Sequence, residues 1–182
     1  MRNIITIIVA TAALTAGCSS SGDAAVVEAT NSSAVTTATE PATVAAPSTA
    51  AETVDAEAVL AELTAAGLPI TDSAAVTETN DANNLIGRPG QYTSKVAFAD
   101  SRVGTPIDQA APGNEAGGSI EVFADDSDAQ ARSDYIQQTL KSLGPIAGTE
   151  YHYLSGPVLV RVTGELVPSA AADYESAVAG LS

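Results

Sequence analysis

The feature that most constrains the fold of this chain is an abrupt change of composition near residue 52. Residues 19–52 consist mainly of Ala, Ser, Thr, Val and Pro, and they contain no Lys, Arg, Leu, Ile or aromatic residue. A segment with so little bulky apolar surface cannot offset the conformational entropy that it would lose on folding. We therefore expect residues 18–52 to form a disordered tether and residues 53–182 to form one domain of ordinary size.

The sole cysteine of the chain, Cys18, follows an apolar segment near the N-terminus. Arg2 precedes this segment, and residues 3–14 are too few for a membrane-spanning helix, which needs about 20 residues. The segment ends in LTAGC at residues 14–18, which resembles the lipobox of bacterial lipoproteins, although Thr15 stands where leucine is commonest. We therefore predict a signal peptide over residues 1–17 and lipidation of Cys18. The alternative is a secreted protein with a free thiol, and a single cysteine offers no disulfide in either case.

The acidic charge of the chain limits the classes of partner that it can bind. The sequence holds 22 Asp and Glu against 7 Lys and Arg, which gives a net charge of −15. Binding to nucleic acid needs clustered Lys and Arg, so no nucleic-acid partner is expected. An anionic membrane surface would repel this protein. We therefore expect the lipid on Cys18 to provide the membrane attachment, at the extracytoplasmic face of the cell membrane.

The spacing of apolar residues predicts the elements of the domain. Helices are expected over residues 53–66, over 127–143 and from Pro168 onward, and strands over 74–79, 91–99, 119–124, 150–154 and 158–163. The strands at 91–99 and 119–124 alternate in polarity and are expected to be half-buried, whereas the apolar strand at 158–163 is expected to be central. Ser127 is the expected N-cap of the second helix. The order αβββαββα predicts an α+β fold of two layers, with helices on one face of a mixed, mainly antiparallel sheet.

Several segments of the domain carry a resemblance to known proteins. They are LIGRPGQYTSKV at residues 85–96, GSIEVF at 118–123, ARSDYI at 131–136, EY at 150–151 and GPVLVRV at 156–162. These segments resemble a group of uncharacterised exported lipoproteins of actinobacteria. The resemblance covers most of the domain and implies a place in an actinobacterial cell envelope. It implies no reaction, ligand or catalytic residue.

Residue types alone indicate no catalytic set. His152 is the sole histidine and is expected to be a strand residue with a local hydrogen bond, because no Gly-x-Ser-x-Gly motif accompanies it. The many carboxylates leave a hydrolase open, since a glycosidase needs only two of them at about 5 to 9.5 Å. The acidic run at residues 125–128 is explained by the start of the following helix rather than by calcium. No cofactor and no metal are expected.

The remaining candidate residues point to recognition. Arg88, Tyr92 and Arg102 lie in or beside loops rich in Gly and Pro, and they are candidates for contact with a partner. For Arg88 and Arg102, pairing with acids of the same chain is favoured over contact with a partner, and we likewise expect Arg161 to pair with Glu121 or Glu150. Residues 104–118 form a connection longer than the roughly 12 residues of an ordinary loop and are a candidate contact surface.

Taken together, these patterns favour a membrane-anchored, non-enzymatic binding module at the cell envelope, with an envelope protein or peptide as its partner. The alternatives are a carboxylate-dependent envelope hydrolase and a spacer with no discrete ligand.

Overall fold

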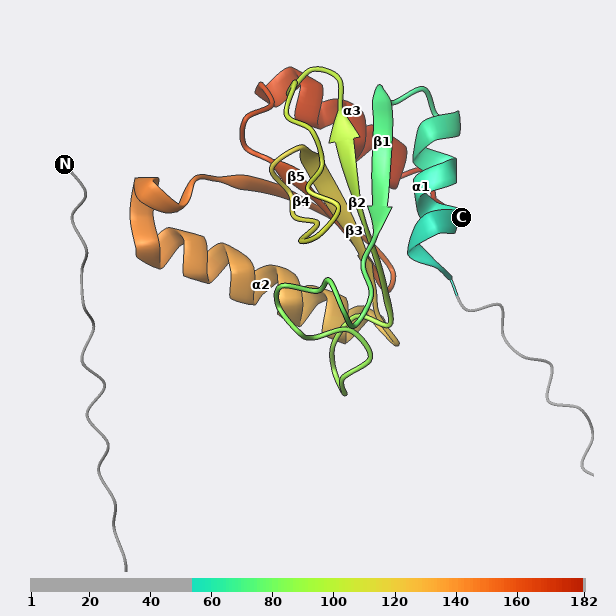
Figure 1. Cartoon of the computed structure of the whole chain (residues 1–182), viewed down its shortest axis with the longest axis vertical. Helices are drawn as coiled ribbons and strands as arrows, with labels where there is room; N and C mark the ends of the chain where they lie inside the picture. The colour runs from blue at the N-terminus through green and yellow to red at the C-terminus, as the bar shows by residue number, and fades with distance from the viewer. Residues whose placement is uncertain (1–53, 182) are drawn as a thin grey trace, which may run out of the picture. The chain divides into compact units, whose positions relative to one another are not determined.

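The computed structural model describes residues 54–181, which form one α+β domain (Figure 1). Its elements are α1 (Ala56–Ala65), β1 (Ile70–Ala75), β2 (Ser94–Asp100), β3 (Gly117–Val122), α2 (Asp126–Leu143), the 3-10 helix η1 (Gly144–Ala147), β4 (Glu150–Ser155), β5 (Val158–Thr163) and α3 (Pro168–Val178). The expected class and the order αβββαββα are confirmed. The predicted signal peptide, Cys18 and the predicted tether lie outside the described residues.

The five strands form one sheet in the order β1-β2-β3-β5-β4. Every neighbouring pair is antiparallel, and residues 150–163 form the expected hairpin. Because β5 lies between β3 and β4, these two strands run parallel to each other, and α2 connects them. The expected central position of β5 is confirmed.

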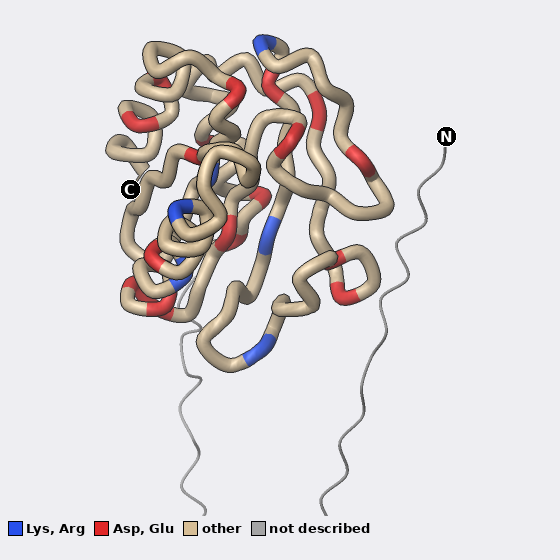
Figure 2. Tube along the Cα trace, turned by 90° about the vertical axis from the view of Figure 1, so that its left-hand side faces the viewer, with Lys and Arg blue, Asp and Glu red and all other residues tan. Residues whose placement is uncertain are grey.

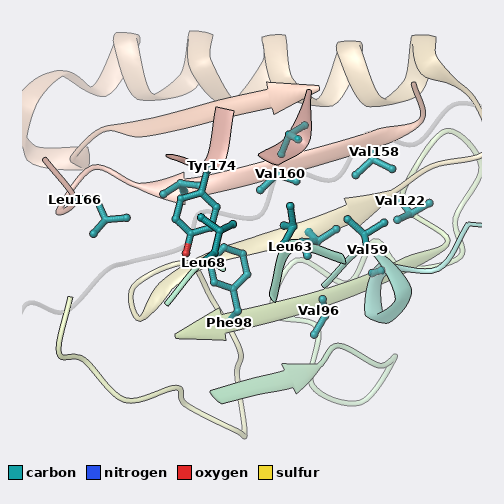
Figure 3. Close-up of a cluster of buried hydrophobic side chains, with 14 of the residues drawn as sticks. Val59, Leu63, Leu68, Val96, Phe98, Val122, Val158, Val160, Leu166 and Tyr174 are labelled. Atoms are coloured by element: carbon teal, nitrogen blue, oxygen red, sulfur yellow. The ribbon is translucent and has the colours of Figure 1, made fainter. Parts of the chain in front are cut away.

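Helices α1 and α3 cover one face of the sheet (Figures 1 and 3). The apolar positions of the strands point toward these helices, and Figure 3 shows Val96, Phe98, Val122 and Val160 among them. The Phe98 ring stacks on Tyr174 of α3 at 5.5 Å between ring centroids. This is the main hydrophobic core, and its burial supplies the largest favourable contribution to folding.

Helix α2 packs on the opposite face of the sheet, so the helices flank the sheet on both sides rather than on one. Arg132 of α2 contacts Glu121 of β3, and Ser133 contacts His152 of β4. Along β3, Glu121 alternates with the core residues Ile120 and Val122, and it therefore belongs to the other face. Strands β2 and β3 are buried on both faces, whereas the alternation predicted half-buried strands.

The bounds of β1 and the N-cap of α2 differ from those expected. Strand β1 begins directly after Pro69 and ends at Ala75. A turn follows it, because the Asn80 side chain accepts a hydrogen bond from the Thr77 amide and donates one to the Ala75 carbonyl. The N-cap of α2 is Asp125 rather than Ser127, since the Asp125 carboxylate accepts hydrogen bonds from both the Asp128 amide and the Ser127 hydroxyl. A carboxylate near the first amides of a helix is also favoured by the helix dipole.

The long connection between β2 and β3 ends two residues earlier than predicted. Gly117 and Gly118 belong to β3, where a Cβ on Gly118 would overlap the Arg161 carbonyl oxygen and lie 2.6 Å from the Phe98 ring. Glycine is therefore required at this close approach of two strands. The preceding residues, 105–116, line a shallow hollow of about 310 Å³.

Candidate functional site

Six ionisable side chains lie between the sheet and α2, and we refer to them as the charge cluster. They are Lys95 of β2, Glu121 of β3, Arg132 of α2, Glu150 and His152 of β4, and Arg161 of β5. Leaving His152 aside, three cations face two carboxylates, so the cluster carries one positive charge in excess. Lys and Arg are otherwise sparse in this acidic domain (Figure 2).

Glu121 is the centre of the charge cluster and is completely buried. Its Oε1 accepts from Lys95 Nζ and from Arg161 Nη1, each at 2.9 Å, and its Oε2 accepts from Arg132 Nε at 3.2 Å. Strand register produces this arrangement, because Lys95 and Glu121 are direct cross-strand partners.

Arg161 joins Glu121 to the second carboxylate, Glu150. Its Nη2 and Nε donate to the two Glu150 oxygens at 2.8 and 2.9 Å, which is a bidentate pair. The expectation that Arg161 pairs with Glu121 or Glu150 is confirmed, and it pairs with both. The charge cluster is thus a continuous network across β2, β3, β5 and β4.

The electrostatics of the cluster keep both carboxylates ionised. Burial would raise the pKa of Glu121, but Lys95, Arg161 and Arg132 outweigh it and lower the pKa to about 2. Burial likewise opposes ionisation of Glu150, yet its hydrogen bonds with His152 and Arg161 lower its pKa to about 2. A buried ion pair is sustained only when nearly every charge has a partner, as here.

Tyr92 lies against the cationic side of the cluster and is completely buried. Lys95 Nζ is 5.1 Å and Arg132 Cζ 5.9 Å from the centroid of its ring, so two cations lie over one aromatic ring. Its side chain offers no surface to a partner, so the prediction that Tyr92 contacts a partner is wrong. It acts instead as a support for the charge cluster.

The Tyr92 hydroxyl donates to Asp81, which organises the loop of residues 81–91. The Asp81 carboxylate also accepts from the Asn83, Leu85 and Ile86 amides at 2.7 to 3.0 Å. Burial would raise the pKa of Asp81, but these hydrogen bonds lower it. One carboxylate thereby fixes a loop of several residues, and its Tyr92 contact fixes the loop against the cluster.

A groove of about 500 Å³ lies between this loop and α2, and we refer to it as the α2 groove. It is lined by Asn83, Leu85, Gly90, Gln91, Ala131, Arg132 and Tyr135. The Tyr135 side chain is 63 % exposed, whereas that of Arg132 is only 10 % exposed. At one end, the Asp128 carboxylate approaches Gly90, where an added Cβ would lie 3.5 Å from Asp128 Oδ1. The groove therefore places one fixed cation beside an accessible aromatic ring.

The two predicted contact arginines differ in their surroundings. Arg102 pairs with Asp100 at 2.7 Å and Asp173 at 2.8 Å, so the intramolecular alternative is confirmed for it. Asp100 also accepts from the buried Tyr174 hydroxyl, which ties this pair to the core. Arg88 is exposed at the tip of the loop that borders the α2 groove, and it remains a candidate for contact with a partner.

Ser133, His152 and Glu150 form a chain of hydrogen bonds like that of a catalytic triad. Ser133 Oγ lies 2.9 Å from His152 Nδ1, and Glu150 Oε2 lies 3.1 Å from His152 Nε2. Ser133, however, faces the sheet from within α2 and is buried, and Glu150 is engaged by Arg161. A nucleophile must reach its substrate, so this geometry is that of a structural contact. The expected local hydrogen bond of His152 is confirmed.

Within residues 54–181, no group of His, Cys, Asp and Glu is arranged to hold a metal ion. The helices of the same residues include none that is long and apolar enough to cross a bilayer.

Comparison with protein families, with curated proteins and with solved structures finds no match for this chain.

Sequence reasoning missed the α2 groove and two members of the charge cluster, Lys95 and Arg132. No functional role was predicted for these two residues or for Asp81. One signal was present: Lys95 and Glu121 occupy corresponding positions in two strands that the sequence already predicted. Opposite charges placed in this way are a known cross-strand pair.

Proposed function

We propose that this protein is a lipid-anchored, extracytoplasmic binding module without enzymatic activity, and that it binds its ligand in the α2 groove. The lipid on Cys18 attaches it to the cell membrane, and residues 18–52 serve as the tether. The resemblance to exported actinobacterial lipoproteins agrees with a place at the cell envelope.

The observation that carries the binding function is the fixed construction of the groove on both sides. Asp81 holds the loop through four hydrogen-bond donors, and Glu121 holds Arg132 through its Nε. Binding sites of small ligands are commonly 300–1,000 Å³ and largely formed before the ligand arrives. A preformed site loses less entropy on binding than a flexible one.

The carboxylates support binding rather than hydrolysis. A general acid needs a carboxyl group that holds its proton near neutral pH. Glu121 and Glu150 have pKa values of about 2 and are paired with cations. Neither one has the raised pKa that the hydrolase alternative requires.

Photo-crosslinking in cells tests the binding function. A Tyr135→p-benzoylphenylalanine variant places the crosslinker at the mouth of the α2 groove, since this side chain is accessible. We expect irradiation to give a discrete adduct on the protein, detected by intact mass. The Ala131→Trp variant, which fills the groove, should reduce the adduct at least fivefold.

The matched control places the same crosslinker on α3, at the exposed Glu175, far along the chain from the groove residues. We expect this variant to give no discrete adduct. Equal adducts from both positions, or an adduct that Ala131→Trp leaves unchanged, would show that the α2 groove is not the binding site.

A further inference from the structure

We propose that the ligand of the α2 groove carries a single carboxylate, such as the C-terminus of a peptide, and that Arg132 receives it. This inference rests on the binding function proposed above. It adds the chemical class of the ligand and the residue that selects it.

The charge of the cluster favours an anionic ligand. Glu121 and Glu150 compensate two of the three cations, and the excess positive charge lies next to a groove into which only Arg132 reaches. The rest of the chain is strongly acidic, so a diffusing anion meets few other attractive positions. An anion bound at Arg132 would pair with the guanidinium nitrogens that Glu121 leaves open.

The orientation of Arg132 favours a planar carboxylate. Its Nε is engaged by Glu121 and its guanidinium lies by the Tyr92 ring, so the plane of the group is fixed. Among the described residues, the hydrogen bonds of Arg132 include no protein acceptor for its two Nη groups. A fixed guanidinium fork matches the two oxygens of a carboxylate, and a lysine cannot reproduce this geometry.

The other groove residues fit the end of a peptide. The amides of Asn83 and Gln91 can donate to and accept from a peptide backbone, and Tyr135 and Leu85 offer apolar surface to a side chain. The Asp128 carboxylate at the end of the groove disfavours a second negative charge on the ligand. A monoanionic carboxylate is therefore favoured over a phosphate dianion.

The test is an NMR titration of the full mature chain, made soluble with Cys18→Ser. The two probes are N-acetyl-alanyl-alanine with a free C-terminal carboxylate and the same peptide as its C-terminal amide. We expect the acid to shift amide signals of residues 83–91 and 131–135 and to bind at least tenfold more tightly than the amide. Acetate alone should shift the same signals with a weaker affinity.

Matched variants assign the preference to Arg132. Arg132→Lys keeps the charge but loses the fork, so we expect at least fivefold weaker binding of the acid. Arg132→Gln should abolish the preference for acid over amide, and Asp128→Asn should tighten binding two- to threefold. Lys141→Gln removes a cation from α2 outside the α2 groove and should change the affinity less than twofold.

Each outcome decides a separate point. Equal affinity for acid and amide would overturn the carboxylate inference, while the binding function would still stand on the crosslinking result. Shifts outside the groove, or no shifts with either peptide or with acetate, would also overturn it. If Arg132→Gln disturbs the spectrum throughout the domain, the comparison between Arg132→Lys and Lys141→Gln decides the role of Arg132.

Discussion

Replacing Glu121 by Gln is expected to destabilise the domain by about 3–5 kcal/mol, a typical cost for breaking a buried ion pair from one side. The change leaves Lys95, Arg132 and Arg161 buried without the carboxylate on which all three converge. Urea denaturation at neutral pH measures the effect, and the slope with denaturant shows whether the transition remains two-state. Glu165→Gln removes one negative charge at an exposed position and should change stability by no more than about 0.5 kcal/mol.

A double variant separates charge from packing in this prediction. Lys95→Met with Glu121→Leu removes one cation together with the carboxylate, and we expect the double variant to be less destabilised than the two single variants added together. A Glu121→Gln variant that loses less than about 1 kcal/mol would mean that the charge cluster does not stabilise the fold in the way described.

Acidification is expected to destabilise the domain between about pH 5 and pH 2. The pKa values of Glu121 and Glu150 are about 2 in the folded state, below the usual 4.5 for glutamate. A lowered pKa contributes stability that is fully present above the unfolded value and is lost as the pH falls through the folded one. The shifts correspond to roughly 3 kcal/mol for each carboxylate. Urea midpoints measured from pH 7 to pH 3 should therefore fall steeply below about pH 5.

The pKa values of Asp81 and Asp100 are also lowered, so these groups lose stability on acidification in the same way. The dependence of the wild-type urea midpoint on pH is therefore the sum of contributions from several carboxylates. The Glu150→Gln variant isolates one of them and should show a shallower dependence of the urea midpoint on pH. A wild-type midpoint that stays constant from pH 6 to pH 3 would contradict the pairing of the buried carboxylates.

The elements of the fold were predictable because each carries a local signal. Gly67 and Pro69 end α1, Gly156 and Pro157 form the turn of the β4–β5 hairpin, and Pro168 begins α3. The apolar residues between such signals repeat with helical or strand periodicity, which sets the class and the order. Local chemistry thus accounts for most of the fold.

The faces of the sheet were not predictable in the same way. Lys95 and Glu121 alternate with apolar residues, which is also the pattern of a strand with one face in water. Whether such positions meet water or a helix depends on where α2 packs, and that is a long-range property. At the C-terminal end of α2 an apolar residue meets water instead. Leu143 continues the apolar spacing of the helix, yet it is 62 % exposed.

The candidate site depended on contacts distant in sequence. Asp81 and Tyr92 are eleven residues apart and meet only because the intervening loop folds back. Arg132 and Glu121 are separated by the start of α2. The exposed Arg88 differs from Arg102 because Arg102 pairs both with Asp100, two residues before it, and with Asp173 on α3. Recognition of a partner stays a prediction, and the location of the α2 groove could not be predicted from the sequence.

The proposed function requires that the domain act while it is attached to the membrane through Cys18. The most direct measurement is the intact mass of the protein extracted from membranes, compared with that of a Cys18→Ser variant. We predict a chain that begins at Cys18 and carries a diacylglyceryl addition, with this addition and the membrane retention both lost in the variant. An unmodified, soluble wild-type protein with a free thiol would contradict the anchored module and favour a secreted protein instead.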